Sequence, residues 1–455
     1  MEPQPRRRCK RRVWRFRIGG LAGFSALALF ALMPAPAPRA LELAAQPQRA
    51  QLGFISNRTG TSLVRLDSIS LKRSGRVLRL NGFAAIWALA PDARTLAVAF
   101  KPHPNSDVDT LRFYTVAGPS RAGRGVPLGG PTAALRWMRS DRILAYVNDC
   151  CTNPDGAGSI LAVDPRTRRV VARTPIAGSV LQIARGPDSL VLLVGKTRQI
   201  GPSRLVVVDA EGASRSVSLD GITAGTAWPE RIDDPIGTRL VPGLEVDTAG
   251  KRAFVVAPDG VAAEVELGSL AVSYHRLVES RSALDRIAEW LTPAAEAKGM
   301  AGPSLTARWV GDGLLGIAGS QENAVREGDR LRMSSHPLGL RIVDTRDWSV
   351  RMLDAGADAF TVSDGLLLVT GASWSSEPQS QSGMGVAVYG PDRTRRFQLL
   401  AGSPAWVGFV HRGRAYFSVS GQLALNVVDL ASGTIVGTRR ADAPWPLLGE
   451  SSLFR

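Results

Sequence analysis

Cysteine and histidine are both scarce in this sequence of 455 residues. Three cysteines are too few for a disulfide-stapled scaffold or for most zinc clusters. The four histidines, His103, His275, His336 and His411, stand far apart, so no HExxH or HxH metal pair is present. The sequence therefore predicts no metal ion and no cofactor.

Lysine is also rare, because 50 of the 56 basic residues are arginines. With 40 acidic residues the net charge is +16, and residues 1–40 carry half of it. In the rest of the chain the arginines are scattered singly, whereas nucleic-acid binders gather them on one face, often with aromatic side chains. Nucleic acid is therefore not an expected partner, and the basic balance indicates at most a weak attraction to anionic surfaces.

The first 33 residues have the pattern of an export signal. A strongly basic run at residues 6–17 precedes sixteen uncharged, mostly apolar residues, Ile18 to Met33. This predicts a hydrophobic helix that acts as a signal peptide or as an uncleaved signal anchor. Its basic end is expected to stay in the cytoplasm. Residues 34–50, rich in Pro and Ala, predict a tether, so we expect an extracytoplasmic protein, membrane-anchored or secreted.

From Gln51 onward the sequence repeats a unit of four short strands. In the clearest copy, FAAIWALAPDARTLAVAF, residues 90–93 form a turn between two strands of alternating pattern. The third strand identifies each copy, and the eight third-strand markers end at Asp67, Ala117, Asp164, Asp209, Leu267, Asp344, Gly390 and Asp429. Five of the seven gaps are near the roughly 40–50 residues of a four-stranded propeller blade.

These repeats predict an all-β fold over residues 51–455. We expect a β-propeller of about eight four-stranded blades, with seven as the alternative. The first unit lacks a first strand, and Pro444 to Phe454 has the pattern of that strand, so both termini are expected to close the ring. The longest gap contains an insertion at about 280–300, where Ser282 to Lys298 has the apolar spacing of a helix.

Several turns resemble those of known bacterial propellers. The Asn57 to Gly60 turn in GFISNRTGTSLVRLD resembles the blade signature of the Tol-system propellers of the periplasm. APDARTLAVAF and LNVVDLASGTIVG resemble the YVTN and WD-repeat-like propellers of bacterial envelopes. The resemblance implies a propeller with a recognition surface at its ends. It implies no catalytic residue, because only blade-building positions match.

The candidate binding loop contains two adjacent cysteines, Cys150 and Cys151. In an oxidising compartment they could form a vicinal disulfide that rigidifies the turn. Asp149, Asn153 and Asp155 add oxygen ligands, but the loop lacks the full ligand series and the bidentate Glu of a calcium loop. A structural turn is the favoured interpretation. A ligand-binding loop made of these five residues is the alternative, and a metal site is not predicted.

Tryptophans recur in the first strands of four units, at Trp87, Trp137, Trp309 and Trp406. We expect them to pack between blades rather than to line a central channel. Three polar segments are predicted to be long loops at the propeller ends, where binding residues concentrate. They are His103 to Asp109, Gln321 to Pro337 and Ser373 to Gly383.

Three functions fit this sequence. The favoured one is a non-catalytic binding or scaffold module, a monomer, for a protein, peptide or glycan of the cell envelope. The alternative is a quinoprotein-like or lyase-like enzyme with its site at the central channel. Eight blades, the adjacent cysteines and the turn from Asp429 to Gly433 faintly resemble quinoprotein dehydrogenases. The third is a purely structural surface module.

Overall fold

The computed structural model describes residues 50–449, with gaps at 58–59, 68, 71, 81, 93, 102–105, 107, 116–119, 149–157, 228–236, 280–300, 328–329, 377–378, 412, 421 and 441–445. Every regular element in these ranges is a strand. They contain no helix with the length and apolar character needed to cross a membrane. The predicted signal helix and nearly all of the tether lie outside the described residues, as does the predicted helical insertion at about 280–300. By its contacts the chain divides into residues 1–33 and residues 34–455, and all described residues belong to the second unit.

The strands form sheets in which strands that follow one another in the sequence mostly pair with one another. The first sheet contains β3 (Arg73–Arg79), β2 (Gly60–Asp67), β1 (Ala50–Asn57) and β35 (Pro446–Gly449). The second contains β4 (Phe83–Leu89), β5 (Thr95–Lys101), β6 (Thr110–Thr115) and β7 (Ser120–Pro127). The third contains β8 (Thr132–Arg139), β9 (Arg142–Asn148), β10 (Gly158–Asp164) and β11 (Arg169–Ile176).

Two further sheets follow in the middle of the chain. One contains β12 (Ser179–Arg185), β13 (Ser189–Gly195), β14 (Ile200–Asp209), β15 (Ser214–Ala227) and the short β16 (Thr238–Leu240). The other contains β17 (Gly243–Val246), β18 (Arg252–Val256), β19 (Val261–Glu266) and β20 (Val272–Arg276).

The last two sheets differ in size. The larger has ten strands, namely β21 (Val278–Glu279), β22 (Gly302–Gly311), β23 (Leu314–Glu327), β24 (Arg330–Pro337), β25 (Leu340–Asp344), β26 (Ser349–Asp354), β27 (Ala359–Ser363), β28 (Leu366–Ser376), β29 (Gln379–Tyr389) and β30 (Arg395–Leu399). The smaller contains β31 (Ala405–His411), β32 (Arg414–Val419), β33 (Gln422–Asp429) and β34 (Thr434–Arg440).

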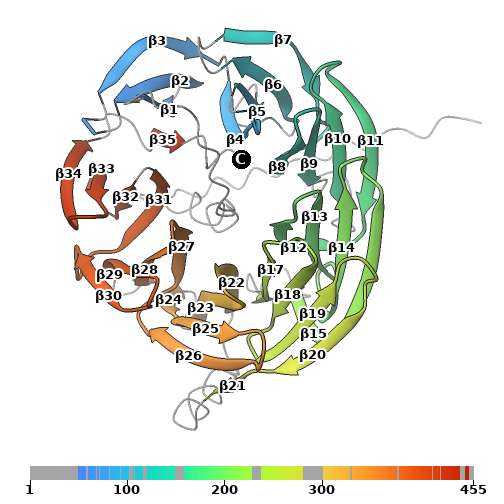
Figure 1. The fold of residues 1–455 in the computed structure, drawn as a ribbon, viewed down its shortest axis with the longest axis vertical. Helices are drawn as coiled ribbons and strands as arrows, with labels where there is room; N and C mark the ends of the chain where they lie inside the picture. The colour runs from blue at the N-terminus through green and yellow to red at the C-terminus, as the bar shows by residue number, and fades with distance from the viewer. Residues whose placement is uncertain are drawn as a thin grey trace, which may run out of the picture. The chain divides into compact units, whose positions relative to one another are not determined.

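Within residues 50–449 the sheets follow one another in chain order around a common axis (Figure 1). The inner strands, meaning those nearest the axis, include β4, β8, β12, β17, β22, β27 and β31, and each begins a unit. Strand β35 pairs with β1 in antiparallel register, with Leu52 opposite Gly449 and Ile55 opposite Pro446. The C-terminal segment therefore takes the first-strand position that the sequence left empty in the first unit.

Apolar side chains are buried between successive sheets rather than in one central core. One buried cluster joins Leu111 and Val126 of the second sheet to Leu135 and Trp137 of the third. Six similar clusters occur in the described part of the chain, each drawing its buried residues from two consecutive groups of strands. Since both faces of these sheets are covered, middle strands such as β13 are apolar along their whole length instead of alternating.

Aspartate ends many third strands because its side chain forms the turn that follows. The Asp67 carboxylate accepts hydrogen bonds from the backbone N–H groups of Ile69 and Ser70, at 3.1 and 2.7 Å. The same arrangement recurs at Asp164, Asp209 and Asp429. An aspartate can thus satisfy the backbone of a tight turn with its own oxygen. This confirms the physical basis of the third-strand markers.

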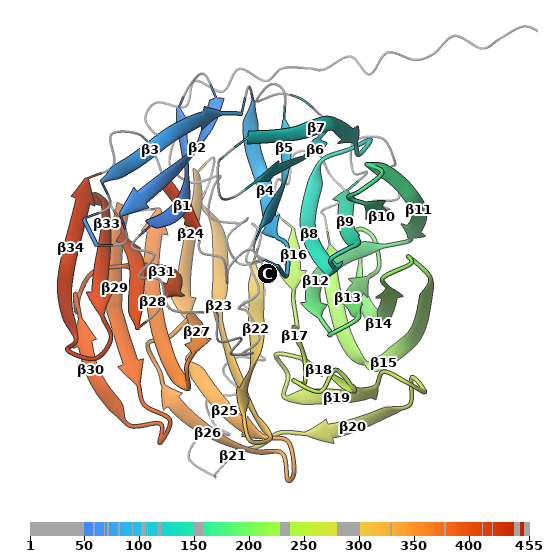
Figure 2. The same ribbon diagram turned by 45° about the horizontal axis from the view of Figure 1, so that its top comes forward.

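Two of the three predicted loops are wrong. Gln321 to Pro337 is instead a β-hairpin of β23 and β24, and Ser373 to Gly383 lies largely in a hairpin of β28 and β29 (Figure 2). The two hairpins also pair with each other, with Ser334 opposite Ser375. Polar side chains suggested loops, but a strand needs only partners for its backbone, and these hairpins supply them to one another. Most of the third segment, His103 to Asp109, lies outside the described residues.

Candidate functional site

The five residues of the predicted binding loop, Asp149, Cys150, Cys151, Asn153 and Asp155, lie outside the described residues. The strands on either side are described, and Asn148 of β9 pairs with Gly158 of β10. The loop therefore connects β9 and β10, two neighbouring strands of one sheet. Its disulfide and its role in binding remain predictions.

The tryptophan prediction is confirmed at three of its four positions. Trp137 is buried, and its indole Nε1 donates a 3.0 Å hydrogen bond to the carbonyl of Ala88 in the preceding sheet. Trp309 stacks on Phe254 of the preceding sheet, with ring centroids 5.5 Å apart. Trp87 lies in a buried cluster shared by the first two sheets. Trp406 is half-buried.

Four charged side chains on inner strands form the candidate functional site, which we call the inner arginine cluster. Its members are Arg136 of β8, Arg185 of β12, Arg308 of β22 and Glu245 of β17. All four are half-buried. Their strands belong to four different sheets in which β12, β17 and β22 are in contact. Figure 1 shows these strands on one side of the axis.

One direct contact lies within this cluster, and a second joins two of its strands. Arg308 Nη1 lies 3.5 Å from Glu245 Oε2, so an ion pair joins β22 to β17. The Gln182 side-chain amide of β12 donates a 3.0 Å hydrogen bond to the carbonyl of Leu305 in β22. That bond joins the sheet of β12 to the sheet of β22, although the sheet of β17 comes between them in chain order. Side chains from sheets far apart in sequence therefore meet near the axis.

Burial and mutual repulsion act on the charges of the cluster. Burial, and then the positive charges of Arg185 and Arg308, lower the pKa of Arg136 to about 10. Burial also lowers the pKa of Arg185. Burial raises the pKa of Glu245, although the nearby Arg308 opposes that shift. At neutral pH Arg136 is still charged, so it lies among other cations, while Glu245 pairs with Arg308.

This arrangement suits the binding of an anion rather than proton transfer. A guanidinium group stays protonated at neutral pH and offers several N–H donors in a plane that matches a carboxylate or a phosphate. In a half-buried setting the attraction between such a group and an anion is stronger than in open water. The inner arginine cluster can therefore hold an anionic group.

Sequence reasoning missed this cluster, although the sequence contains a signal for it. Arg136 and Arg308 each directly precede a tryptophan of an otherwise apolar first strand, in TAALRWMR and LTARWVG. An arginine that occurs at the same place in two copies of an apolar strand indicates a position that does more than pack in the hydrophobic core. What could not be predicted was that Arg185 and Glu245, which lack this dipeptide, would lie beside them.

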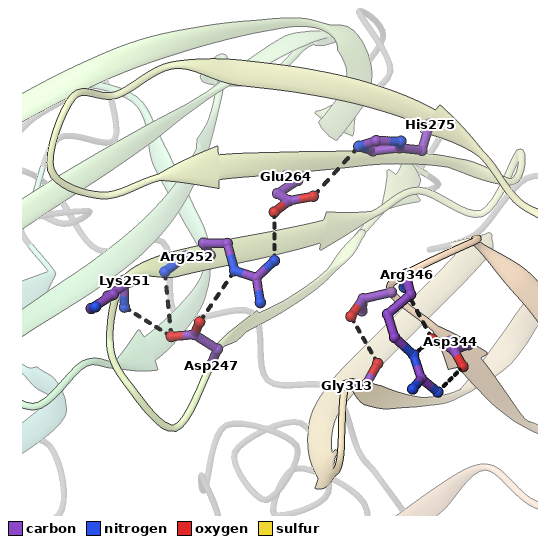
Figure 3. Close-up of polar contacts among 9 residues, drawn as sticks. Asp247, Lys251, Arg252, Glu264, His275, Gly313, Asp344 and Arg346 are labelled. Atoms are coloured by element: carbon purple, nitrogen blue, oxygen red, sulfur yellow. Dashed lines mark hydrogen bonds and ion pairs between the residues drawn. The ribbon is translucent and has the colours of Figure 1, made fainter.

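A second charged network serves to join sheets. The guanidinium of Arg252 contacts Asp247 Oδ2 at 3.3 Å and Glu264 Oε1 at 2.9 Å (Figure 3). Glu264 also lies 3.5 Å from His275 Nε2, and the His275 ring stacks on Trp348 of the next sheet, 4.1 Å away. Each acid of the network has a cationic neighbour, and the network ends in an aromatic contact between sheets. We interpret it as structural.

The described residues contain no group of three or more His, Cys, Asp or Glu side chains that could hold a metal ion. His275 belongs to the network above. His336 lies in β24, where its ring nitrogen Nδ1 is 3.4 Å from the side-chain amide of Asn323, and burial lowers its pKa. For His411 the structure describes the backbone, in β31, and His103 lies outside the described residues.

Comparison with known proteins identifies the fold. The sequence matches no protein family and no curated protein. Dihydro-heme d1 dehydrogenase NirN in complex with DHE is structurally similar, with a TM-score of 0.55 and 14% identity over 93% of this chain and 80% of that chain. Apo AztD from Citrobacter koseri gives a TM-score of 0.47 and 11% identity over 87% of this chain and 96% of that chain.

The chain is a β-propeller, and it is entirely β in the part that the structure describes. The predicted all-β propeller is thereby confirmed, whereas the number of blades, the closure of the ring and the N-terminal helix stay predictions. At 14% identity the likeness shows the fold alone, because one propeller scaffold carries many unrelated functions.

Proposed function

We propose that this chain is a binding propeller of the cell envelope that holds an anionic group of its partner at the inner arginine cluster. The partner is an envelope protein, peptide or glycan that carries carboxylate groups. Nucleic acid is not proposed as a partner. The module binds without chemistry of its own and acts as a monomer.

One observation carries this proposal, namely the clustering of Arg136, Arg185 and Arg308 on inner strands, where the charges of Arg185 and Arg308 lower the pKa of Arg136. Holding three guanidinium groups together away from water is unfavourable unless something compensates. Binding sites commonly retain such unfavourable arrangements because the ligand supplies the compensating charge. An anion placed among these side chains would relieve their repulsion.

The proposal includes a closed ring of eight blades. The ten-stranded sheet divides into two four-stranded groups, β22–β23–β25–β26 and β27–β28–β29–β30, joined through the pairing of β24 with β28. If these two groups are counted as separate units, they make eight units together with the other six sheets. The pairing of β35 with β1 supports closure by both termini, which would leave no sheet edge exposed.

We further propose that the propeller lies outside the cytoplasm. The support is the basic and apolar pattern of residues 1–33, followed by the Pro/Ala-rich tether at 34–50. In this proposal the N-terminal segment either anchors the propeller to the membrane or directs its secretion. The Cys150–Cys151 loop, with Asp149, Asn153 and Asp155, is proposed as a rigid turn, closed by a disulfide in that oxidising compartment.

The test uses a fluorescein-labelled hexaglutamate peptide as an anionic probe and hexaglutamine as its neutral counterpart. Fluorescence anisotropy should show the exported protein binding hexaglutamate at least tenfold more tightly than hexaglutamine. Arg136→Met should weaken that binding at least tenfold, since a charge-assisted hydrogen bond contributes about 1.5–3 kcal/mol. Arg94→Ala removes the same charge from an exposed turn and serves as the control.

The proposal fails if hexaglutamate does not bind, or if Arg136→Met binds it as well as the unaltered protein does. Native mass spectrometry of the exported protein tests the enzyme alternative at the same time. A retained organic cofactor would contradict a module without chemistry and favour the quinoprotein-like or lyase-like function.

A further inference from the structure

A second basic site lies away from the inner arginine cluster, at the seam between the second and third sheets. It is a pocket of about 390 Å³ lined by Arg124, Gly125 and Pro127 of β7 and by Thr167, Arg168 and Arg169 at the start of β11. Three of these six residues are arginines and none is acidic. We call this site the seam pocket.

Arg168 is held in place by its backbone and by a glycine of the facing strand. Its φ of +56° is left-handed, and its N–H donates a 2.8 Å hydrogen bond to the carbonyl of Asp164. A Cβ atom built on Gly123 of β7 would lie only 1.5 Å from Arg168 Nη1. The guanidinium therefore lies directly over the bare backbone of Gly123, and any larger residue there would displace it.

The Nε–H of Arg168 is buried, and no hydrogen-bond acceptor for it exists among the described residues. Buried donors are nearly always satisfied in folded proteins, because an unmade hydrogen bond costs free energy. The nearby carboxylate of Asp164 is engaged with the backbone N–H groups of Arg166 and Thr167, at 2.7 and 3.1 Å. A bound ligand could supply the acceptor that the described residues do not.

We propose that the seam pocket binds a phosphoryl group, either that of a soluble phosphate monoester or that of a lipid headgroup. A phosphate offers several acceptor oxygens pointing in different directions and up to two negative charges. The pocket is lined by the guanidinium side chain of Arg168, the exposed side chains of Arg124 and Arg169, and Thr167 with its hydroxyl. Three arginines that approach from two strands fit a tetrahedral dianion better than a planar carboxylate.

The first experiment is an isothermal titration of the exported protein with inorganic phosphate in a low-salt buffer. The proposal predicts binding of one phosphate that Arg168→Ala and Arg169→Ala each weaken at least tenfold. Arg94→Ala, in an exposed turn elsewhere, should leave the affinity unchanged. Gly123→Ala keeps all three arginines but displaces the Arg168 guanidinium, so it should also weaken binding. Because Arg169 is exposed, its variant is expected to fold even if a change at Gly123 or Arg168 prevents folding.

A second arm identifies the source of the phosphoryl group. Co-sedimentation is measured with phosphatidylcholine vesicles, with and without one-fifth phosphatidic acid. Binding to phosphatidic acid that depends on Arg168 would support a lipid headgroup, whereas binding of phosphate alone would support a soluble monoester. The absence of phosphate binding, or binding that survives Arg168→Ala and Arg169→Ala, would overturn the proposal.

These tests can contradict the proposal for the seam pocket without contradicting the proposal for the inner arginine cluster, and the reverse. Arg136→Met should leave phosphate binding at the seam pocket intact, and Arg168→Ala should leave hexaglutamate binding intact. Phosphate binding that is lost only in Arg136→Met would assign the anion to the inner arginine cluster, and the seam-pocket proposal would then be wrong.

Discussion

The indole Nε1 of Trp137 donates a hydrogen bond to the carbonyl oxygen of Ala88, 3.0 Å away and 49 residues earlier in the chain. The bond joins β8 to β4, the inner strands of two neighbouring sheets. Because a propeller has no single core, such contacts between sheets hold the ring together. Beside Trp137 on the same inner strand lies Arg136 of the inner arginine cluster.

Trp137→Phe should therefore lower the stability of the propeller. The substitution keeps an aromatic ring but removes a buried hydrogen bond and leaves the Ala88 carbonyl without this donor. We expect the free energy of unfolding to fall by about 1–2 kcal/mol in urea denaturation. Trp406→Phe is the matched control, because Trp406 is only half-buried, and it should cost clearly less. Equal losses in both variants would contradict this role of Trp137.

Arg136→Met should make the protein more stable while weakening its binding of anions. Burial and two neighbouring arginines disfavour the charge of Arg136 and lower its pKa to about 10. An uncharged side chain of similar length removes this cost. We expect a gain of about 1–2 kcal/mol, since the side chain is partly exposed to solvent and the full shift is not realised. A loss of stability in urea denaturation would show that Arg136 is a structural residue.

Glu245→Gln should strengthen hexaglutamate binding. Glu245 repels an anionic ligand, and its removal leaves Arg308 available to the ligand. We expect the dissociation constant measured by fluorescence anisotropy to fall about three- to tenfold, because one repulsive charge is lost in a partly buried setting. Burial raises the pKa of Glu245, so the neutral variant should be no less stable than the parent protein. Weaker binding would mean that Glu245 contacts the ligand itself.

Asp358 should make the stability of the protein depend on pH. Burial raises its pKa to about 7, although its carboxylate accepts a 3.0 Å hydrogen bond from Ala372 N–H. The folded state therefore keeps a proton that the unfolded state releases near pH 4. The stability that this proton contributes is present below pH 4 and is lost as the pH rises through about 7.

Asp358→Asn removes this dependence, because the amide keeps a carbonyl acceptor for Ala372 and cannot ionise. Relative to the parent protein, the variant should gain about 1–2 kcal/mol on going from pH 4 to pH 8, less than the full pKa shift corresponds to because Asp358 is partly exposed to solvent. Urea denaturation of both proteins at the two pH values measures this difference. An unchanged difference between pH 4 and pH 8 would show that the carboxyl group ionises freely.

The sequence predicted the fold well because the propeller repeats its local chemistry. The turn aspartates Asp67, Asp164 and Asp429 appear in the sequence at the ends of apolar strands, and each forms its turn with neighbours only a few residues away. The missing first strand could also be inferred, since an incomplete first unit requires a partner from the other end of the chain. Both inferences depend on local patterns.

The inner arginine cluster could not be predicted in the same way, because its members come from four sheets. Nothing in the sequence around Glu245 indicates a partner 63 residues away at Arg308. The hairpins of β23–β24 and β28–β29 were missed for a related reason. Their polar side chains conceal a strand whose partner, for Ser334, is Ser375 of the next hairpin. Contacts of this kind become visible only once the sheets are arranged around the axis.

The central claim is that Arg136, Arg185 and Arg308 together hold an anionic group. The most direct test is NMR of the arginine Nε–Hε groups in the exported, arginine-labelled protein, with each signal assigned by substitution. On addition of hexaglutamate, the signals of these three arginines should shift together, and Arg94 should not move. If hexaglutamate binds while the signals of Arg136, Arg185 and Arg308 stay in place, the anion binds elsewhere and the claim is wrong.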